Sequence, residues 1–326
     1  MNRRQMLAVS AALPASLASP LASPAIAQTF DRPFRLVVPF APGGTSDILG
    51  RILAPELTRL LGQNVVVENR SGAAGNLGAQ LVAQSNPDGQ AILLIDTGVL
   101  ATAPSLYTRL PFDPSKDLAP VNLLIYAPYI LAVHPSVPAR NAAELVAYAK
   151  ANPNRINVAN SGVGAANHLT SLMLAGHWGA EVTQVPYRGG AAALSAVTGG
   201  EAQLIVNGAT ATAPFVKDGR LRGIAVSGPR RFADLPDLPT FTELGWPAGD
   251  SGTWQGALVQ GATPAPIIAR LDQAFRAALA VPDVARRMAE LGAEVRAIGP
   301  AEFRTWLATE TETWGQVVRA NNVRLD

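Results

Sequence analysis

Short apolar runs alternate with amphipathic segments along the first third of the chain. Residues 34–40, 64–68 and 91–95 form runs whose length and composition are typical of buried strands. Residues 47–61 carry apolar side chains at helical spacing, and a shorter helix is predicted near residues 77–84. Strands that alternate with helices predict an α/β fold with a parallel, doubly wound sheet.

The alternation restarts after a long apolar run at residues 121–133. We interpret this run, which Pro128 interrupts, as a strand that crosses into a second lobe. Residues 221–226 are predicted to return to the first lobe as a second crossover strand. The elements predicted between the two crossovers are helix 142–151, strand 156–159, helix 166–176, strand 182–186, helix 191–197 and strand 202–206.

Two crossovers predict two lobes that are joined by a hinge. The first lobe is predicted to comprise residues 28–126 and 225–326, and the second lobe residues 127–224. A cleft between two α/β lobes is a common place for a small-molecule site. The sequence therefore predicts a ligand cleft between the lobes.

After the second crossover, the pattern predicts only loops and helices. Thr263 is predicted to cap a helix with Pro264 at its first position, and Pro282 is predicted to end that helix and open another. The last helix is predicted at residues 300–321. Its aromatic and apolar side chains lie mostly on one face, which favours packing against the core over a place in a site.

The first 27 residues have the order of a secretory signal peptide. Arg3 and Arg4 precede an apolar stretch rich in Ala, Leu and Ser, which ends in Ala25-Ile26-Ala27. The paired arginines fit a twin-arginine signal and an ordinary Sec signal equally well. We therefore expect export to the periplasm, cleavage after Ala27 and a mature chain without a membrane span.

Removal of this segment balances the charge of the chain. The full sequence has 26 basic and 24 acidic residues, and two arginines are the only charged residues in the first 27, so the mature chain has 24 of each sign. This balance disfavours nucleic acid or an anionic membrane surface as the main partner. The sequence has no cysteine, which excludes disulfides, thiolate nucleophiles and cysteine-based metal sites.

Four glycine-bearing turns stand where a predicted strand passes into a predicted helix, at residues 42–47, 71–76, 161–168 and 188–190. Backbone N–H groups at a helix start have no partner within the helix and lie at the positive end of its dipole. Glycine lets an anion approach them closely. A single turn of this kind can simply start a helix. The turns at 42–47 and 161–168, however, fall in opposite lobes and lack Lys and Arg, which favours a carboxylate held by N–H groups and hydroxyls.

Other chemistry has weaker support in the sequence. Residues 161–167 partly imitate a dinucleotide-binding turn, but Asn167 replaces its third glycine and no acid ends the next strand. The three histidines lack metal-ligand spacing and no catalytic serine motif is present, so the residues predict no catalytic or metal-binding group. His168 could donate to a ligand or be a packed histidine. Asp47 could bind a cationic ligand group or serve its own helix start.

Seven segments together make the chain similar to a known family. Each segment alone is common, but jointly they resemble the tripartite tricarboxylate transporter substrate-binding proteins, also called Bug receptors, over nearly the whole mature chain. The segments are residues 38–47 (VPFAPGGTSD), 68–76 (ENRSGAAGN), 86–89 (NPDG), 185–190 (VPYRGG), 199–203 (GGEAQ), 235–240 (LPDLPT) and 243–245 (ELG).

The resemblance implies a periplasmic, two-lobed Venus-flytrap receptor with the type II periplasmic-binding-protein fold and two crossover strands. It implies a small carboxylate ligand, membrane permease subunits as partners and no cofactor or metal, and we expect a monomer that does not bind nucleic acid. The first turn would hold one carboxylate, the second would close on it, and two more residues would reach the variable end of the ligand. The predicted ligand-binding residues are Phe40, Ala41, Gly43, Gly44, Thr45 and Asp47 in the first turn, Ser161, Gly162, Asn167 and His168 in the second, and Thr97 and Asn207 at the variable end.

Two residues depart from the family pattern. Asn167 stands where members often carry Ser or Thr, and Asn207 stands where they often carry Asp. Loss of that acid disfavours a ligand with an amino group and favours a plain organic or aromatic acid. A transport receptor is the first hypothesis, and an orphan binding protein that presents its ligand to a sensor kinase is the second. An exported hydrolase is the third, and the lack of an evident nucleophile–base pair argues against it.

Overall fold

A computed structural model gives the fold of residues 30–320 and 323–324. The predicted signal peptide, residues 1–27, lies outside the described residues. Residues Asp31–Asp326 cluster as one unit and are described together. Within the described ranges, no helix combines the length and the apolar composition that crossing a membrane requires.

One strand connects the two halves of the ten-stranded sheet that the described residues form. Strand β4 (Leu118–Val133) is buried along all 16 residues. This burial accounts for its apolar composition, because a strand covered on both faces needs no alternation of polar and apolar residues. Its first part pairs antiparallel with β9 (Gly252–Gln260), and its last part pairs antiparallel with β7 (Leu204–Gly208) and β8 (Arg222–Val226).

The beginning and the end of the chain build the first half of the sheet. Its strand order is β2-β1-β3-β9-β4, and β10 pairs with β4 as well. Strand β1 is parallel to both of its neighbours, β2 and β3, whereas β9 and β10 are antiparallel to theirs. The other elements of this half are β1 (Phe34–Val38), α1 (Thr45–Leu61), β2 (Val65–Asn69), the 3-10 helix η1 (Ala73–Gly75), α2 (Asn76–Ala83), β3 (Ala91–Asp96), α3 (Thr97–Leu106), α8 (Ala265–Leu279), α9 (Pro282–Glu290), β10 (Glu294–Ile298) and α10 (Pro300–Ala320).

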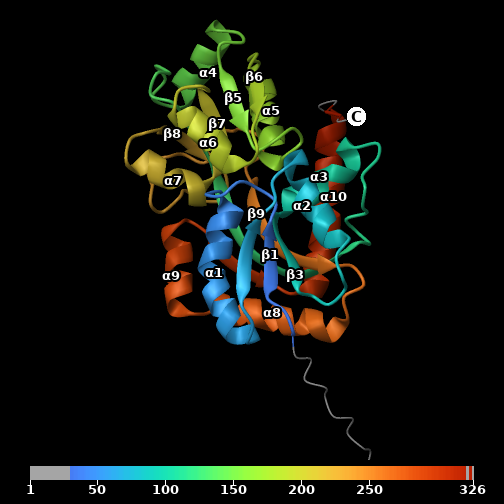
Figure 1. Ribbon diagram of the computed structural model, residues 1–326. Coiled ribbons are helices and arrows are strands. Elements are labelled where there is room, and N and C mark those ends of the chain that lie inside the picture. Colours follow the sequence, from blue (N-terminus) through green and yellow to red (C-terminus); the bar gives the residue numbers. More distant parts are fainter. Residues whose placement is uncertain (1–29, 321–322, 325–326) are drawn as a thin grey trace, which may run out of the picture. The chain divides into compact units, whose positions relative to one another are not determined.

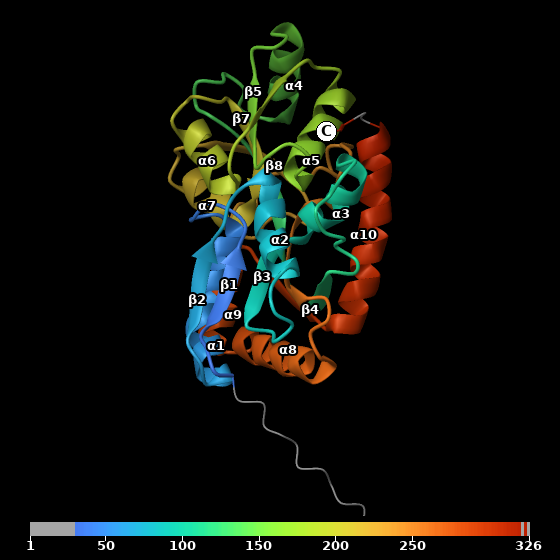
Figure 2. The same cartoon turned by 45° about the vertical axis from the view of Figure 1, so that its right-hand side comes forward.

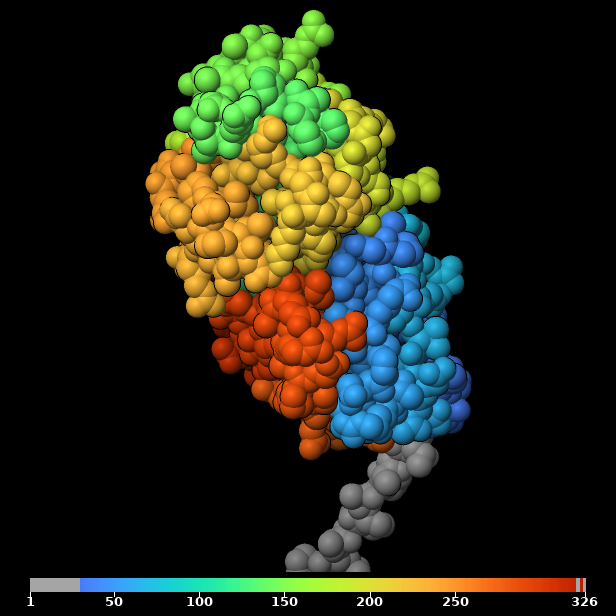
Figure 3. Space-filling view, turned by 90° about the vertical axis from the view of Figure 1, so that its left-hand side faces the viewer, coloured from blue at the N-terminus to red at the C-terminus, as the bar shows by residue number. Residues whose placement is uncertain are grey.

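The middle of the chain builds the second half of the sheet. Its strand order is β4-β7-β5-β6, and β5 is parallel to both neighbours. In Figures 1 and 3 this green and yellow part of the chain lies above the blue beginning and the red end. The other elements of this half are α4 (Ala142–Ala151), β5 (Asn157–Asn160), α5 (Ala166–Trp178), β6 (Thr183–Pro186), α6 (Gly190–Thr198) and α7 (Ala209–Lys217).

Buried apolar side chains join the sheet to its helices. In the first half, Leu93 and Leu123 from two strands pack in one fully buried cluster with Phe303 of α10. The indole of Trp306, also on α10, lies against that of Trp254 with ring centroids 4.9 Å apart. The prediction that the last helix uses its aromatic side chains for packing is confirmed for Phe303 and Trp306. Figure 2 shows α10 running along α3.

The sheet is mixed, where the sequence pattern predicts a parallel one. The parallel strands are correctly predicted, but β9 and β10 lie in the stretch that was predicted to hold only loops and helices. β9 contains two glycines and two glutamines, so its composition does not indicate the strand that pairing with β3 and β4 stabilises. Helices α3 and α7 were also not predicted, because Pro104 and Pro214 inside them lower intrinsic helix propensity.

Two predicted boundaries differ from the structure. Residues 221–226 were predicted to return to the first lobe, but they contain the whole of β8, which stays paired with the last part of β4. The chain returns through the segment after β8 to β9. Helix α8 begins at Ala265, and its cap is Pro264 rather than Thr263, because the Pro264 carbonyl accepts the first helical N–H, that of Ile267.

Candidate functional site

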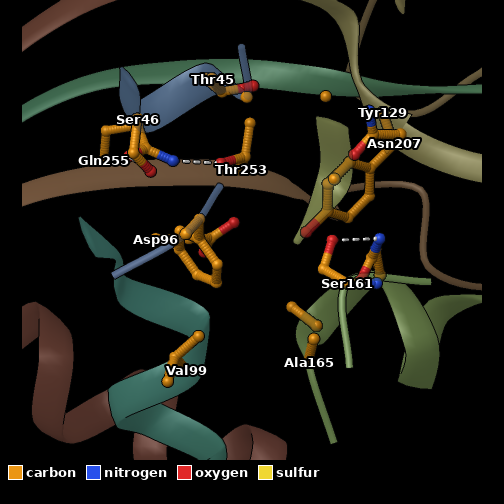
Figure 4. Close-up of a pocket in the computed structure, with 16 residues that line it drawn as sticks. Thr45, Ser46, Asp96, Val99, Tyr129, Ser161, Ala165, Asn207, Thr253 and Gln255 are labelled. Atoms are coloured by element: carbon orange, nitrogen blue, oxygen red, sulfur yellow. Dashed lines mark hydrogen bonds between the residues drawn. The ribbon is translucent and has the colours of Figure 1, made fainter. Parts of the chain in front are cut away.

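A cavity lies where loops from both halves of the sheet converge (Figure 4). The space between its atoms, with the open solvent at its mouth included, amounts to about 490 Å³. Small, hydroxyl and amide residues dominate the lining, and none of the described residues in it is Lys, Arg or His. The lining residues are Phe40, Gly44, Thr45, Ser46, Asp96, Val99, Tyr129, Ser161, Ala165, Ala166, Asn167, Gly190, Asn207, Gly208, Thr253 and Gln255.

Five helices of the described chain begin at this cavity. Gly44, Asp96, Ala165 and Gly208 are the N-cap residues of α1, α3, α5 and α7, and Gly190 is the first residue of α6. Only α3 has a side-chain cap, and the other four starts have none. The first N–H groups of a helix have no partner within it and carry the positive end of its dipole. The cavity is therefore surrounded by donors that suit an anion.

The close approach of the loops requires glycine at two of these helix starts. A Cβ atom at Gly190 would lie 2.5 Å from Oδ1 of Asn207, and one at Gly208 would lie 2.7 Å from Oγ1 of Thr45. Both distances are well below ordinary van der Waals contact. Asn207 is held in place because its Nδ2 donates to Oγ1 of Thr212 at 3.1 Å. The two glycines thus allow α1, α6 and β7 to meet around the cavity.

The cavity lining contains half of the predicted ligand-binding residues. The residues that line it are Phe40, Gly44, Thr45, Ser161, Asn167 and Asn207. The residues that lie outside the lining are Ala41, Gly43, Asp47, Thr97, Gly162 and His168. Both predicted turns contribute to each group, so each turn has some residues at the cavity and others behind it.

Asp47 organises the first turn from behind the cavity. Its buried carboxylate accepts hydrogen bonds from the Gly43 N–H (2.8 Å) and from Nδ2 of Asn69 (3.0 Å), and it pairs with Arg51 at 2.9 Å. Burial by itself would raise the pKa of Asp47, but these donors outweigh it and hold the pKa below the usual value. The Gly43 N–H is therefore engaged by Asp47, which supports its own helix start.

Asn167 ties the second turn to the neighbouring strand β7. Its Nδ2 donates to Oγ of Ser161 (3.0 Å) and to the carbonyl of Val206 (3.1 Å). The N–H of Gly162 donates to Oδ1 of Asn160 (3.0 Å). These bonds hold Ser161 and Asn167 at the cavity wall, whereas the Gly162 N–H is used within the turn.

His168 supports the second turn as a neutral, buried side chain. The N–H of Gly164 donates to Nδ1 of His168 at 3.1 Å, which leaves the ring proton on Nε2. Burial lowers the pKa of His168 to about 4. Of the two roles that the sequence left open, this geometry favours the packed histidine.

The buried ring of His168 should make the protein less stable in mild acid. Its pKa is about 4 in the folded state against 6.5 when unperturbed, so the unfolded chain takes up the proton first. The free energy of unfolding is therefore unaffected by protonation of His168 above pH 6.5. It falls by about 1.4 kcal/mol per pH unit as the pH is lowered from 6.5 towards 4. We expect wild type to lose about 2–3 kcal/mol relative to His168→Gln across this window, measured by urea unfolding. The raised pKa of Asp96 acts in the opposite direction but is common to both proteins. Parallel pH profiles of the two proteins would contradict this assignment.

Ala41 and Thr97 direct their polar groups away from the cavity. The N–H of Ala41 donates to the carbonyl of Arg188 at 3.3 Å. Thr97 is fully buried, and its hydroxyl donates to the carbonyl of Trp254 at 3.1 Å. Both groups connect neighbouring segments of the chain and hold the walls in place.

The cavity contains an acid that the sequence analysis missed. Asp96 ends β3 and lines the cavity, one residue before the predicted Thr97. Its carboxylate accepts the N–H of Gly98 at 3.0 Å and so caps α3. Burial raises the pKa of Asp96 to about 6, although the hydrogen bonds from Thr253 and Gly98 act in the opposite direction. Its place at the carboxyl end of a parallel strand is a signal that could have identified it.

A chain of hydrogen bonds connects Asp96 with α1, and part of it is visible in Figure 4. Oγ of Ser46 donates to Oε1 of Gln255 (2.7 Å), and Nε2 of Gln255 donates to Oγ1 of Thr253 (2.5 Å). The Thr253 hydroxyl in turn donates to Asp96. Because each group donates to the next, the orientation of every side chain in the chain is defined. The sequence analysis missed Thr253 and Gln255 because it did not predict β9.

Binding is the chemistry that these groups support. Asp96 and Tyr129 are the titratable groups of the described lining. Burial raises the pKa of Tyr129 well above its ordinary value, so this side chain remains a neutral phenol. Across the residues that the structure describes, no group of three or more His, Asp or Glu side chains is placed to hold a metal ion.

The chain is similar in sequence and in structure to several known proteins. Residues 49–323 match the family described as the tripartite tricarboxylate transporter family receptor. Protein BugT of Bordetella pertussis (strain Tohama I) is 32% identical over 327 residues and is covered, like this chain, to 100%. The structure of the periplasmic binding protein BugD is 35% identical with a TM-score of 0.87, over 90% of this chain and 99% of BugD. The structure of R. palustris Rpa4515 with adipate is 31% identical with a TM-score of 0.85, over 90% of this chain and 98% of that one.

These similarities confirm the family resemblance seen in the sequence motifs. They also confirm the fold class, because the described chain superposes on periplasmic binding proteins over nine tenths of its length. The α/β chain therefore has the two-lobed periplasmic-binding-protein fold. It belongs to the tripartite tricarboxylate transporter receptor family.

Proposed function

We propose that this protein is a periplasmic receptor that captures a small organic carboxylate and delivers it to the permease subunits of a tripartite tricarboxylate-type uptake system. The observation that carries the proposal is the set of four uncapped helix starts around one cavity, those of α1, α5, α6 and α7. Together they present several N–H donors and the positive ends of four helix dipoles.

The donors around the cavity favour a carboxylate over a more highly charged anion. The lining offers N–H groups, hydroxyls and amides, and the described part of it has no basic side chain to balance a second or third charge at the same point. A carboxylate carries one negative charge and two acceptor oxygens. The relative Rpa4515 was solved with adipate, a dicarboxylate, which supports the same ligand class here.

Ligand capture would use both lobes. The predicted division placed residues 28–126 and 225–326 in one lobe and 127–224 in the other; we propose the same two lobes with all of β8 in the second, because β8 pairs with the last part of β4. Thr45 and the first N–H groups of α1 would hold the carboxylate from the first lobe. Ser161, Asn167 and Asn207 would contact the ligand from the second lobe. A ligand that contacts both lobes favours the closed form by its difference in affinity for the closed and open forms.

The proposal predicts that small carboxylates raise the melting temperature of the purified, ligand-free protein. A thermal-shift screen would cover mono-, di- and tricarboxylates, aromatic acids and amino acids, and calorimetry would give the affinity of each acid that binds. A ligand at 100 times its dissociation constant should add about 2.7 kcal/mol to the free energy of unfolding. The matched control is the primary amide of the same acid, which has a similar shape but lacks the negative charge.

Four results would contradict this function. An amide that binds as tightly as its acid, or a screen in which no acid binds, would remove the carboxylate site. Turnover of a bound acid by the purified protein would point to a hydrolase instead. Uptake of the labelled acid that is unchanged in cells lacking this protein would remove the role in transport.

A further inference from the structure

We propose that Asp96 makes the cavity select small zwitterionic acids, which carry a cationic nitrogen in addition to the carboxylate. This inference rests on the proposed carboxylate-binding function and narrows its ligand class. Asp96 is the one formally charged residue among the described residues that line the cavity. A ligand without a positive group would place its own negative charge in a cavity that already holds one.

The carboxylate of Asp96 is not neutralised by the protein. Its hydrogen-bond partners in the described structure are the N–H of Gly98 and the hydroxyl of Thr253, and neither partner is charged. A carboxylate has about four acceptor positions, so two neutral donors leave part of its capacity unused. Figure 4 shows Asp96 beside Thr253 and across the cavity from Ser161 and Tyr129. The unused capacity is therefore available to a ligand.

The charge around the cavity is polarised. Four helix starts present uncapped N–H groups, whereas the start of α3 is covered by the Asp96 side chain. The four uncapped helix starts favour a negative group on the ligand, and the start of α3, where the Asp96 carboxylate lies, favours a positive group. A ligand with both charges satisfies both regions and is oriented by them. Burial raises the pKa of Asp96 to about 6, as expected for an acid that lacks a cation.

Helix capping alone does not explain the charge at this position. Asn, Ser and Thr cap helices about as well as Asp does and would leave no net charge in the cavity. The Thr253 hydroxyl, oriented by Gln255 and Ser46, donates to Asp96 and thereby holds the carboxylate in place. Side chains from α1 and β9 thus position the carboxylate of Asp96. The negative charge of this carboxylate is not needed to cap α3.

Asp96 changes the expectation that Asn207 raised. The sequence analysis disfavours an amino group on the ligand because Asn207 stands where the family often has an acid. The structure places an acid in the same cavity from β3, on a different element from β7, which carries Asn207. Asp96 can therefore supply the negative charge that an ammonium group on the ligand needs and that the neutral Asn207 lacks.

The test compares acids that differ only in an ammonium group. The probes are three pairs: L-glutamate with glutarate, L-aspartate with succinate, and 4-aminobutyrate with butyrate. Calorimetry on the purified wild-type protein should show that the amino member of at least one pair binds about tenfold or more tightly than its plain partner, as expected for a charge-assisted hydrogen bond. Asp96→Asn should bring the ratio close to one, mainly by weakening the amino member.

Two further variants keep the result interpretable. Asp96→Ser retains a capping side chain, so a preference lost in both variants reflects charge rather than the start of α3. Asp31→Asn removes an acid whose side chain is 78% exposed and which is absent from the cavity lining, and it should leave the ratio unchanged. Each variant is first checked for cooperative unfolding.

The outcomes separate this inference from the proposed function. If plain acids bind as tightly as their amino partners in every pair, or if Asp96→Asn leaves the preference intact, the selection by Asp96 is wrong and the carboxylate receptor stands. If neither member of any pair binds and the wider acid screen also fails, the proposed function is wrong and the selection falls with it. If only acids without a nitrogen bind in the wider screen, the selection alone is wrong.

Discussion

Replacement of Gly44 by tryptophan is expected to lower the affinity of the cavity for its carboxylate ligand about 100-fold or more, equivalent to about 2.7 kcal/mol. Gly44 caps α1 with an ordinary extended backbone (φ −82°), so the backbone tolerates a larger residue. A Cβ atom there would lie 3.8 Å from the N atom of Ala191, which is normal contact. The rest of an indole would occupy the space in front of the first N–H groups of α1. Calorimetry with the acid found by the screen measures the loss.

The matched control for this substitution is Gly176→Trp. Gly176 lies on the exposed part of α5, and no other atom lies within 4 Å of an added Cβ there. This variant should keep wild-type affinity, and both variants should unfold cooperatively. Wild-type affinity in Gly44→Trp would remove the start of α1 from the binding site.

Replacement of Phe303 by alanine is expected to lower the free energy of unfolding by about 3–5 kcal/mol. Phe303 is fully buried and packs in the cluster that also contains Leu93 and Leu258. A Cβ atom at Gly256 of β9 would lie 2.5 Å from the Phe303 ring, which shows how closely α10 is seated on the sheet. Truncation would leave a cavity that the packed strands cannot close. Urea unfolding measures the change.

The ligand affinity of the folded Phe303→Ala protein should stay close to wild type, since Phe303 is not among the cavity-lining residues. The neighbouring Glu302→Ala, an exposed position of α10, is the control and should change stability by less than about 0.5 kcal/mol. A loss below about 1 kcal/mol in Phe303→Ala would mean that α10 does not complete the core of the first half of the sheet.

The spacing of apolar residues along the chain correctly predicted the strands and helices whose stability depends on neighbouring residues in the sequence. The strands β1, β2, β3, β5 and β6 and the helices α1, α2, α4 and α5 follow apolar runs and helical spacing, and the structure has them within a few residues of the predictions. The missed strand β9 is rich in Gly and Gln and is stabilised by neighbours more than 120 positions away along the chain. No window of sequence around β9 contains those neighbours.

The residues of the candidate site were likewise predicted only in part from the sequence. Gly44, Thr45, Ser161 and Asn167 were identified from turns between strands and helices, and they line the cavity. His168 stands in one of the same turns but faces inward, where it accepts a hydrogen bond from the turn itself. Turn sequence locates a loop, but the direction of each side chain depends on the partners that surround it.

The sequence by itself determined the family, most of the alternation of strands and helices, and three of the four uncapped helix starts at the cavity, those of α1, α5 and α6, because these features are encoded by short motifs and by the period of apolar residues. Only the tertiary structure decided which polar groups share the cavity. The bond between Ser46 and Gln255 joins residues 209 positions apart, and the charge of Asp96 acquires meaning from a lining that otherwise carries none. The physical reason is that hydrogen bonds and electrostatic fields act through space, between segments that only the packing of the sheet and its helices brings together.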